Sequence, residues 1–227
     1  MASPSSTPVY VIDADYHESG RLHHAVMVRL YHPQGVASRV LTSADNAESE
    51  QNALTALSGT FSAFVQRTAA WNSRGKVFAG LTQRFLAMAT PFPWYYRDRF
   101  GPRYRYSDSE NLDLYDFFTE YGAVKMDLVD AMRALDYVLP REAFDSACTR
   151  AFASALLCLR ADYVSGLADA LMFTDSMERI RTGIRRNLYE LVSGTSADAF
   201  GVEVTPDWRE YVLPAYQDIG AAFGYPV

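Results

Sequence analysis

Residues 9–15, Val-Tyr-Val-Ile-Asp-Ala-Asp, decide the fold predicted for this chain. The β-branched and aromatic run that begins at Val9 is bounded by Pro8 and Asp13, which is typical of a buried strand. Asp13 and Asp15 come directly after this strand, and because side chains alternate along an extended chain, both carboxylates can lie on one side. Such oxygen ligands suit Mg²⁺ or Mn²⁺, but acidic residues after a strand more often form a turn or a helix cap.

The composition of the 227 residues suits one folded domain with a helical addition. Hydrophobic residues make up 49% of the chain, which supplies a core and argues against global disorder. The net charge of −6 does not by itself favour nucleic-acid binding, so the location of the positive charge matters more. Cys148 and Cys158 lie in one helical stretch, which argues against a disulfide and favours a reducing, cytoplasmic location. The histidines and cysteines have no zinc-site spacing, and no apolar run is long enough to span a membrane.

Hydrophobic periodicity predicts strands first, then alternating helices and strands, then helices. Strands are predicted at 9–12, 25–31, 36–41, 69–71 and 112–114. The first helix is predicted to begin at a cap formed by Ser43 or Asp45 and to have apolar positions over 54–65, and Asp116 is a candidate cap for a helix that starts at Phe117. Further helices are predicted near 76–89, 127–137, 143–173, 175–193 and 207–222. This order predicts an α/β fold with a mixed sheet, in which three antiparallel N-terminal strands are joined by parallel strands and flanked by helices. We expect residues 1–8 to form a flexible arm, 9–175 the α/β domain, and 176–227 a helical C-terminal extension.

An irregular segment, residues 92–106, interleaves aromatic side chains with four arginines. Aromatic rings can stack on bases, and guanidinium groups can hold phosphates, so this segment is a candidate for binding single-stranded nucleic acid. Alternatively, the aromatic rings pack onto the core and the arginines remain solvated at its rim.

Several segments, taken in order over roughly residues 9–175, resemble the predicted 3′-5′ exonucleases related to the proofreading domain of family-B DNA polymerases. The similar segments are Val11-Ile12-Asp13-Ala14-Asp15 (first motif), Trp71-Asn72-Ser73-Arg74-Gly75 (Asn-Gly-Arg-Gly turn), Pro93-Trp94-Tyr95-Tyr96 with Arg103-Tyr104-Arg105-Tyr106, Asn111 to Phe118 with Tyr121-Gly122-Ala123, and Cys158-Leu159-Arg160-Ala161-Asp162 (third motif). The resemblance implies the RNase H-like fold of the DEDD superfamily.

The resemblance also implies a site and a reaction, two-metal hydrolysis of a phosphodiester at a single-stranded 3′ end. The implied catalytic and metal-binding residues are Asp13, Asp15 and Asp162, with Mg²⁺ or Mn²⁺ as cofactor, and the implied nucleic-acid-binding residues are Asn72, Arg74, Trp94, Tyr95, Arg103 and Arg105. The second-motif acid aligns with Val77, which cannot bind a metal, and the third-motif tyrosine aligns with Cys158. The sequence thus leaves one metal site and damages the other, unless Asp113 or Asp116 substitutes from elsewhere.

Three interpretations follow from these motifs. The chain is an active metal-dependent 3′-5′ exonuclease, or a catalytically degenerate module that binds nucleic acid or a protein in a larger complex, or an α/β domain whose resemblance is accidental. The C-terminal arginines Arg179, Arg181, Arg185 and Arg186 can serve as a docking element for a protein partner, a second copy or a phosphate backbone, or they form an ordinary solvated helix face.

Overall fold

The computed structural model describes residues 8–30, 37–64, 67–95, 111–135 and 141–167, together with 170, 171, 173–175 and 177. Its elements are, in chain order, β1 (Val9–Tyr16), β2 (Leu22–Leu30), β3 (Ala37–Thr42), α1 (Ala47–Phe64), β4 (Arg67–Ala70), the π-helical turn η1 (Ser73–Val77), α2 (Phe78–Ala87), β5 (Asn111–Asp113), α3 (Leu114–Thr119), α4 (Leu128–Arg133), the 3₁₀ turn η2 (Arg141–Asp145) and α5 (Ala147–Val164). Most of the predicted N-terminal arm and C-terminal extension lies outside the described residues.

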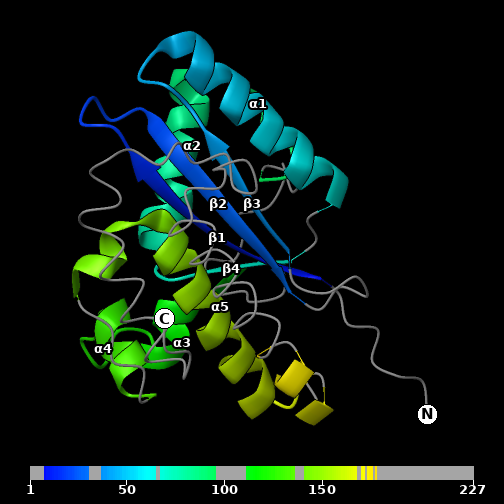
Figure 1. The fold of residues 1–227 in the computed structure, drawn as a ribbon, viewed down its shortest axis with the longest axis vertical. Helices are drawn as coiled ribbons and strands as arrows, with labels where there is room; N and C mark the ends of the chain where they lie inside the picture. The colour runs from blue at the N-terminus through cyan, green and yellow to red at the C-terminus, as the bar shows by residue number, and fades with distance from the viewer. Residues whose placement is uncertain are drawn as a thin grey trace, which may run out of the picture.

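The strands form one five-stranded mixed sheet in the order β3-β2-β1-β4-β5 (Figure 1). β2 runs antiparallel to both β1 and β3, whereas β4 runs parallel to both β1 and β5. The predicted α/β class, with three antiparallel N-terminal strands and further parallel strands, is therefore confirmed. Within the described part of the chain, no helix has both the length and the apolar character needed to cross a membrane.

The two faces of the sheet carry separate hydrophobic cores. On one face, Val9 and Val11 of β1 pack with α5, and Val26, Val28 and Leu30 of β2 join them, as the alternation of β2 predicts. On the other face, apolar side chains of β1 pack with α1 and α2, and this core includes Tyr10, Ile12, Leu54, Leu57 and Phe61. Because side chains alternate, Asp13 and Asp15 lie on the same face as Val9 and Val11 and point toward α5.

The first strand is longer than its apolar run predicts. β1 continues through Tyr16, so Asp13 and Asp15 lie inside the strand and not after it. The antiparallel partner explains the difference, because Asp13 pairs with Val26 and Asp15 pairs with His24 along β2. The backbones of Asp13 and Asp15 are therefore paired with β2 in the sheet, and neither residue belongs to a turn.

Two helix caps also differ from those that the sequence favours. The side chain of Asn46 accepts a hydrogen bond from the Ser49 backbone N–H at 2.9 Å at the start of α1, where the sequence offers Ser43 or Asp45. The Asp113 carboxylate, and not that of Asp116, caps α3 by accepting from the Tyr115 N–H at 3.1 Å. In each case several adjacent residues have capping side chains, and only the backbone path decides which one is used.

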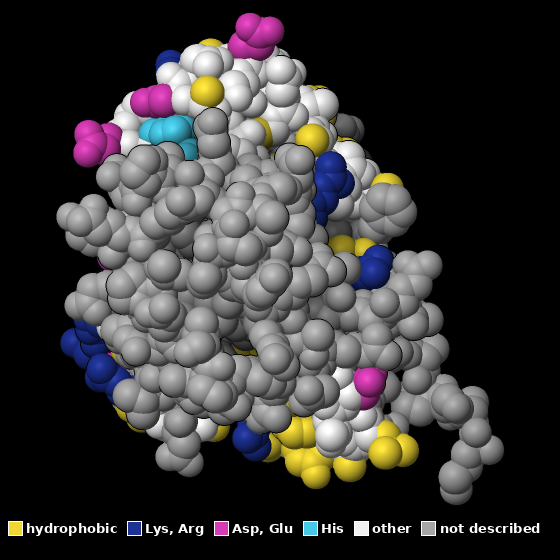
Figure 2. Space-filling view, in the orientation of Figure 1, with side chains coloured by type: hydrophobic (Ala, Val, Ile, Leu, Met, Phe, Trp, Pro, Cys, Tyr) yellow, Lys and Arg dark blue, Asp and Glu magenta, His cyan; other side chains and the backbone are white. Residues whose placement is uncertain are grey.

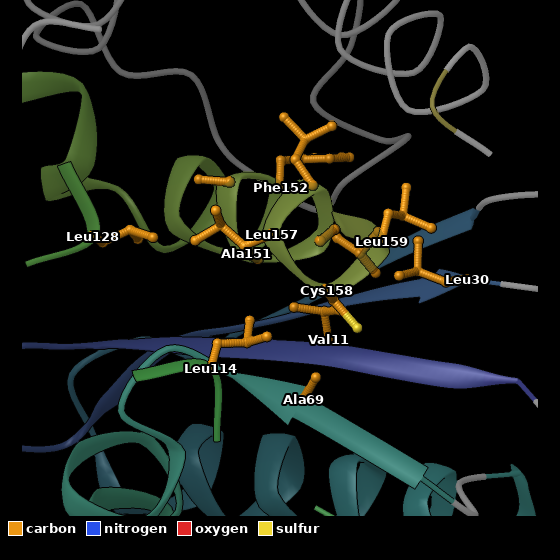
Figure 3. Close-up of a cluster of buried hydrophobic side chains, with 14 of the residues drawn as sticks. Val11, Leu30, Ala69, Leu114, Leu128, Ala151, Phe152, Leu157, Cys158 and Leu159 are labelled. Carbon is orange, nitrogen blue, oxygen red and sulfur yellow. The ribbon is translucent and has the colours of Figure 1, made fainter. Parts of the chain in front are cut away.

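Helix α5 crosses the sheet antiparallel to β1, with small side chains toward the strands. Figure 3 shows Cys158 directed toward Val11 and Ala69, and Ala151 lies in the same core. The first turn of α5 reaches the end of β1, where Arg150 contacts Asp13. The last turn reaches the beginning of β1, because Asp162 pairs with Arg67, which is opposite Val9 in the β1–β4 register. The direction of α5 thus decides which of its side chains meet the two carboxylates.

Candidate functional site

The carboxylates of Asp13 and Asp15 converge on the guanidinium group of Arg150. Its Nη2 donates to Asp13 Oδ1 at 2.8 Å and to Asp15 Oδ1 at 2.5 Å, and its Nε donates to Asp13 Oδ1 at 3.1 Å. Charge-assisted hydrogen bonds of this length are among the strongest in proteins. A permanent cation therefore lies between two of the side chains that the resemblance assigns to a metal ion.

The rest of the guanidinium group is held by backbone carbonyls. Arg150 Nη1 donates to the carbonyl oxygens of Phe144 at 3.0 Å and Asp145 at 2.8 Å, and Nη2 also contacts the Ala14 carbonyl at 3.1 Å. Every nitrogen of the guanidinium group thus has an acceptor. Because these acceptors come from β1 and from η2, just before α5, they fix the position of Arg150 from two directions.

Asp15 also anchors the start of α5. Its Oδ2 accepts a hydrogen bond from the Ala147 backbone N–H at 2.7 Å, so one carboxylate binds both the arginine and the helix N-terminus. The first N–H groups of a helix have no intrahelical acceptor and favour an anion. Ser146 supplies a further cap, because its hydroxyl accepts from the Cys148 N–H.

Burial sets the protonation behaviour of this cluster. Only 5% of the Asp13 side chain and 14% of the Arg150 side chain are exposed to solvent. Burial raises the pKa of Asp13, and the Arg150 guanidinium opposes that shift. Burial alone would lower the pKa of Arg150, but the carboxylates of Asp13 and Asp15 hold it above its ordinary value. Arg150 therefore stays cationic, and a guanidinium group cannot activate water as a bound metal ion does.

The structure does not bring Asp162 to Asp13 and Asp15. Arg67 Nη1 lies 3.5 Å from Asp162 Oδ1, and the Cys158 thiol donates to Asp162 Oδ2 at 3.8 Å. Arg150 and Asp162 stand at opposite ends of α5, about 18 Å apart at a rise of about 1.5 Å per residue. Three carboxylates that the resemblance groups around one metal are therefore divided between the two ends of this helix.

A second group of ionic contacts joins the turn after β4 to β5 and α3. Arg74 Nη1 donates to Asp116 Oδ2 at 2.6 Å, and Nη2 donates to the Asn111 carbonyl at 3.3 Å. The Arg74 backbone N–H donates to Asp113 Oδ2 at 2.9 Å, so that carboxylate caps both η1 and α3. Burial raises the pKa of Asp113, and the Arg74 backbone hydrogen bond opposes the rise. Arg74, Asp113 and Asp116 are thus engaged with one another.

Two other predicted nucleic-acid-binding residues, Asn72 and Trp94, pack against neighbouring parts of the domain. Asn72 adopts a left-handed backbone conformation (φ 50°), and its side chain covers Gly75, where an added Cβ would collide with Asn72 Oδ1. Trp94 is 3% exposed and packs against Phe61 and Phe78. The alternative in which the aromatic residues pack onto the core therefore describes Trp94.

Tyr95 is partly buried and stacks on Phe78 and Phe92. Arg103 and Arg105 lie outside the described residues. Val77, which aligns with the second-motif acid, is buried in the core that contains α1 and α2.

His17, which is six residues before His23, lies beside His23 and His24 in the structure. The ring of His23 is 4.2 Å from that of His17 and 3.6 Å from that of His24, between ring centroids. The register explains this, because Asp15 pairs with His24 while Tyr16 pairs with Leu22, which leaves His23 as an extra residue in a β-bulge. Figure 2 shows imidazole side chains grouped on the surface near acidic side chains. Burial first, and His23 second, lower the pKa of His24 to about 4.

No three or more His, Cys, Asp or Glu side chains among the described residues are arranged to hold a metal ion. The chemistry that the described site supports is ionic binding and helix anchoring, in which each carboxylate at the end of β1 has a cationic or N–H partner. No protein-family model matches the sequence, and a search of curated proteins finds no significant match.

Proposed function

We propose that this chain is an RNase H-like module, related to 3′-5′ exonucleases, that has lost hydrolysis and acts by binding a protein partner. The strand order β3-β2-β1-β4-β5 and the helices on both faces support the fold. The observation that carries the functional part is the Arg150 guanidinium between Asp13 and Asp15.

The loss of hydrolysis follows from the ligands that a metal ion would need. Mg²⁺ and Mn²⁺ require carboxylate oxygens, and Arg150 already binds one oxygen of Asp13 and one of Asp15. A two-metal mechanism also needs further acids, but Val77 stands at the second-motif position and Asp162 lies at the far end of α5. With Arg150 in place, the cluster ties α5 to β1, and a cation already lies where a metal ion would bind between Asp13 and Asp15.

The contacts of Arg74 and Trp94 favour a protein partner over a single-stranded nucleic acid. Arg74 is paired with Asp116, and Trp94 is buried, so neither offers a free guanidinium group or a free ring to a strand. A binding module needs a stable scaffold, and the ionic contacts at the carboxyl ends of β1 and β5 provide one. The remaining candidates for binding a 3′ end are Asn72, Tyr95, Arg103 and Arg105.

The proposal is tested first by a nuclease assay on the full chain. Single-stranded DNA and RNA with a 5′ label are incubated with the protein and Mn²⁺, beside Asp13→Asn as the matched variant. We expect both proteins to leave the substrates at full length. Shortening by the wild type that Asp13→Asn abolishes would overturn the proposal in favour of an active exonuclease.

A binding measurement separates the two kinds of partner. Fluorescence polarisation with a labelled single-stranded oligonucleotide is recorded for the wild type and for Arg103→Ser with Arg105→Ser. We expect no saturable binding in either case. Saturable binding by the wild type that the double variant loses would show that the partner is nucleic acid.

A thermal-shift experiment tests the role of Arg150 directly. Added Mn²⁺ is expected to leave the melting temperature of the wild type unchanged, because Asp13 and Asp15 are occupied. In Arg150→Met the two carboxylates lose their cation, so Mn²⁺ is expected to raise the melting temperature through preferential binding to the folded state. An equal shift in both proteins would mean that Arg150 does not exclude a cation.

A further inference from the structure

Strand β3 forms an edge of the sheet (Figure 1), because β2 is its only strand neighbour among the described residues. The Ser43 N–H donates to the His23 carbonyl at 2.9 Å, and since hydrogen-bonding direction alternates along a strand, the backbone groups of Arg39 point to β2. The backbone N–H and C=O groups of Ser38 and Val40 therefore point away from the sheet. An edge of this kind can pair with an added extended chain.

Two arginine side chains lie side by side on one face of this edge. Arg29 pairs with Ala37, and Arg39 pairs with Met27, so the two arginines are diagonal neighbours across β2 and β3. Met27 belongs to the core that contains α1 and α2, and Arg39 Nη1 donates to Thr60 Oγ1 of α1 at 2.8 Å. Both cations are thus on the α1 face of the edge, where one ligand can contact both.

No carboxylate balances the charge of Arg29 and Arg39 in the described part of the chain. Neither β2 nor β3 contains an Asp or a Glu, and α1 has none after Glu50. The buried Nε of Arg29 has no hydrogen-bond partner, and Arg39 donates to a neutral hydroxyl. Other described arginines have acidic partners, namely Arg21, Arg67, Arg74, Arg84, Arg133, Arg141 and Arg150. A charged N–H group that is buried without an acceptor lowers stability, so an anion that a ligand brings to this position binds favourably.

We propose that β3 is the docking strand for an extended segment of a protein partner in which acidic and β-branched residues alternate. This inference rests on the proposed function, because it names where the protein partner binds. In an added strand, the side chain opposite Arg39 lies on the α1 face, where its carboxylate meets Arg39 and Arg29. The next side chain lies on the other face, beside Val40 of the core that contains α5, and a β-branched residue suits that position.

The backbone edge favours a peptide over a nucleic acid. Ser38 and Val40 each offer one N–H donor and one C=O acceptor, and the backbone of an extended peptide supplies matching groups at the same spacing. A phosphodiester chain could meet the arginines, but it has no N–H groups to donate to the two carbonyls. Strand pairing thus selects a peptide, and the arginines select its charge.

Fluorescence polarisation with the full chain tests this site. The probe is a fluorescein-labelled peptide of alternating glutamate and valine, beside a peptide in which lysine replaces glutamate. We expect saturable binding of the first peptide, and binding weaker by at least about tenfold in Arg29→Gln with Arg39→Gln, because charged hydrogen bonds are lost. The control, Arg133→Gln with Arg141→Gln, has the same change in net charge but affects ion pairs on exposed surface elsewhere, so we expect little change. Equal affinity for both peptides, or unchanged binding by the Arg29 and Arg39 variant, would overturn the proposal.

Failure of this inference and failure of the proposed function give different results. An absence of saturable binding by the glutamate–valine peptide would overturn the docking strand alone, because the nuclease assay and the Arg150→Met experiment do not involve β3. A labelled single-stranded oligonucleotide is measured in parallel. If it binds, and Arg29→Gln with Arg39→Gln loses that binding, the arginines hold phosphate, and both the docking strand and the protein partner are wrong.

Hydrogen exchange in the unsubstituted protein remains decisive if the arginine variants do not fold. We expect the glutamate–valine peptide to slow exchange at the Val40 amide, which points away from the sheet, and to leave the Arg39 amide, which faces β2, unchanged. No added protection at Val40 would overturn the proposal. Protection at Val40 that grows with protein concentration in the absence of peptide would overturn it as well, because a second copy would then occupy the edge.

Discussion

Ion pairs join both ends of α5 to the sheet, but the helix supplies the cation at one end and the anion at the other. At the N-terminal end, Arg150 of the helix meets Asp13 and Asp15 of β1, and at the C-terminal end, Asp162 of the helix meets Arg67 of β4. Each helix residue has the charge that the macrodipole disfavours at its end, since a cation is best placed at the C-terminus and an anion at the N-terminus. Both ends therefore depend on their tertiary partners.

The two ends differ in how firmly they are held. Arg150 has charge-assisted hydrogen bonds of 2.5 to 3.1 Å to two carboxylates, and Asp15 also accepts from the first turn of the helix. The Arg67–Asp162 pair is longer, at 3.5 Å. The N-terminal end of α5, where Asp13 and Asp15 lie, thus has the shorter ionic contacts with the sheet. Under the proposed function, such fixation keeps an exchangeable metal ion away from Asp13 and Asp15.

The largest effect is expected from Arg150→Met. This change leaves Asp13 and Asp15 without their cation, and removal of one partner from a buried ion pair costs about 3–5 kcal/mol. The free energy of unfolding from urea denaturation measures the loss. Arg133→Met is the control, because its pair with Asp130 is 3.9 Å long and half exposed, so we expect less than about 1 kcal/mol.

The double variant Asp13→Asn with Arg150→Met shows which lost contact of Arg150 causes the fall in stability. If the cost of Arg150→Met comes from an unpaired buried carboxylate, neutralising Asp13 recovers part of the lost stability. Costs that simply add would show that Arg150 acts mainly through its contacts with the Phe144 and Asp145 carbonyls.

A smaller effect is expected from Asp162→Asn at the other end of α5. The amide keeps the shape and one acceptor oxygen but loses the charge that faces Arg67, which costs about 1–3 kcal/mol for a buried charged hydrogen bond. Urea denaturation again measures the change, with Asp130→Asn as an exposed control on α4. If Asp162→Asn lowered the free energy of unfolding as much as Arg150→Met does, the two ends of α5 would contribute equally to stability.

The strands could be predicted from the sequence wherever alternation is regular. Val26, Val28 and Leu30 lie on one face of β2 as their spacing predicts, because a half-buried strand selects apolar residues at every second position. The end of β1 could not be predicted, since Asp13 and Asp15 are poor strand formers that β2 holds in extended conformation by pairing.

Only half of the cluster around Arg150 could be found from local sequence. Asp13 and Asp15 stand out after an apolar run, but Arg150 belongs to no motif and is separated from them by most of the domain. The resemblance directs attention to Asp162 because it compares residue types, whereas the register of α5 against β1 decides which helical turn lies beside the carboxylates. The bulge at His23 could not be predicted from local sequence either, because a one-residue insertion in a strand pair depends on how β1 and β2 pair.

The smallest effect on stability is expected from a change of pH, and this effect is confined to the N-terminal end of α5. His24 is opposite Asp15 at the Arg150 end, and burial lowers its pKa from 6.5 to about 4. The unfolded chain therefore binds a proton at His24 more readily than the folded chain, so stability is complete above pH 6.5 and falls as the pH drops toward 4. In His24→Gln this contribution is absent. We expect the free energy of unfolding to decline less steeply between pH 7 and pH 5, with a difference from the wild type of less than about 1 kcal/mol because His24 is partly exposed. The protection of the Ala147 amide, which donates to Asp15, against hydrogen exchange is expected to fall at pH 5, relative to the intrinsic exchange rate at that pH, before the protection of amides in the last turn of α5 falls. Parallel pH profiles for His24→Gln and the wild type would show that this end of the helix is no more acid-sensitive than the other.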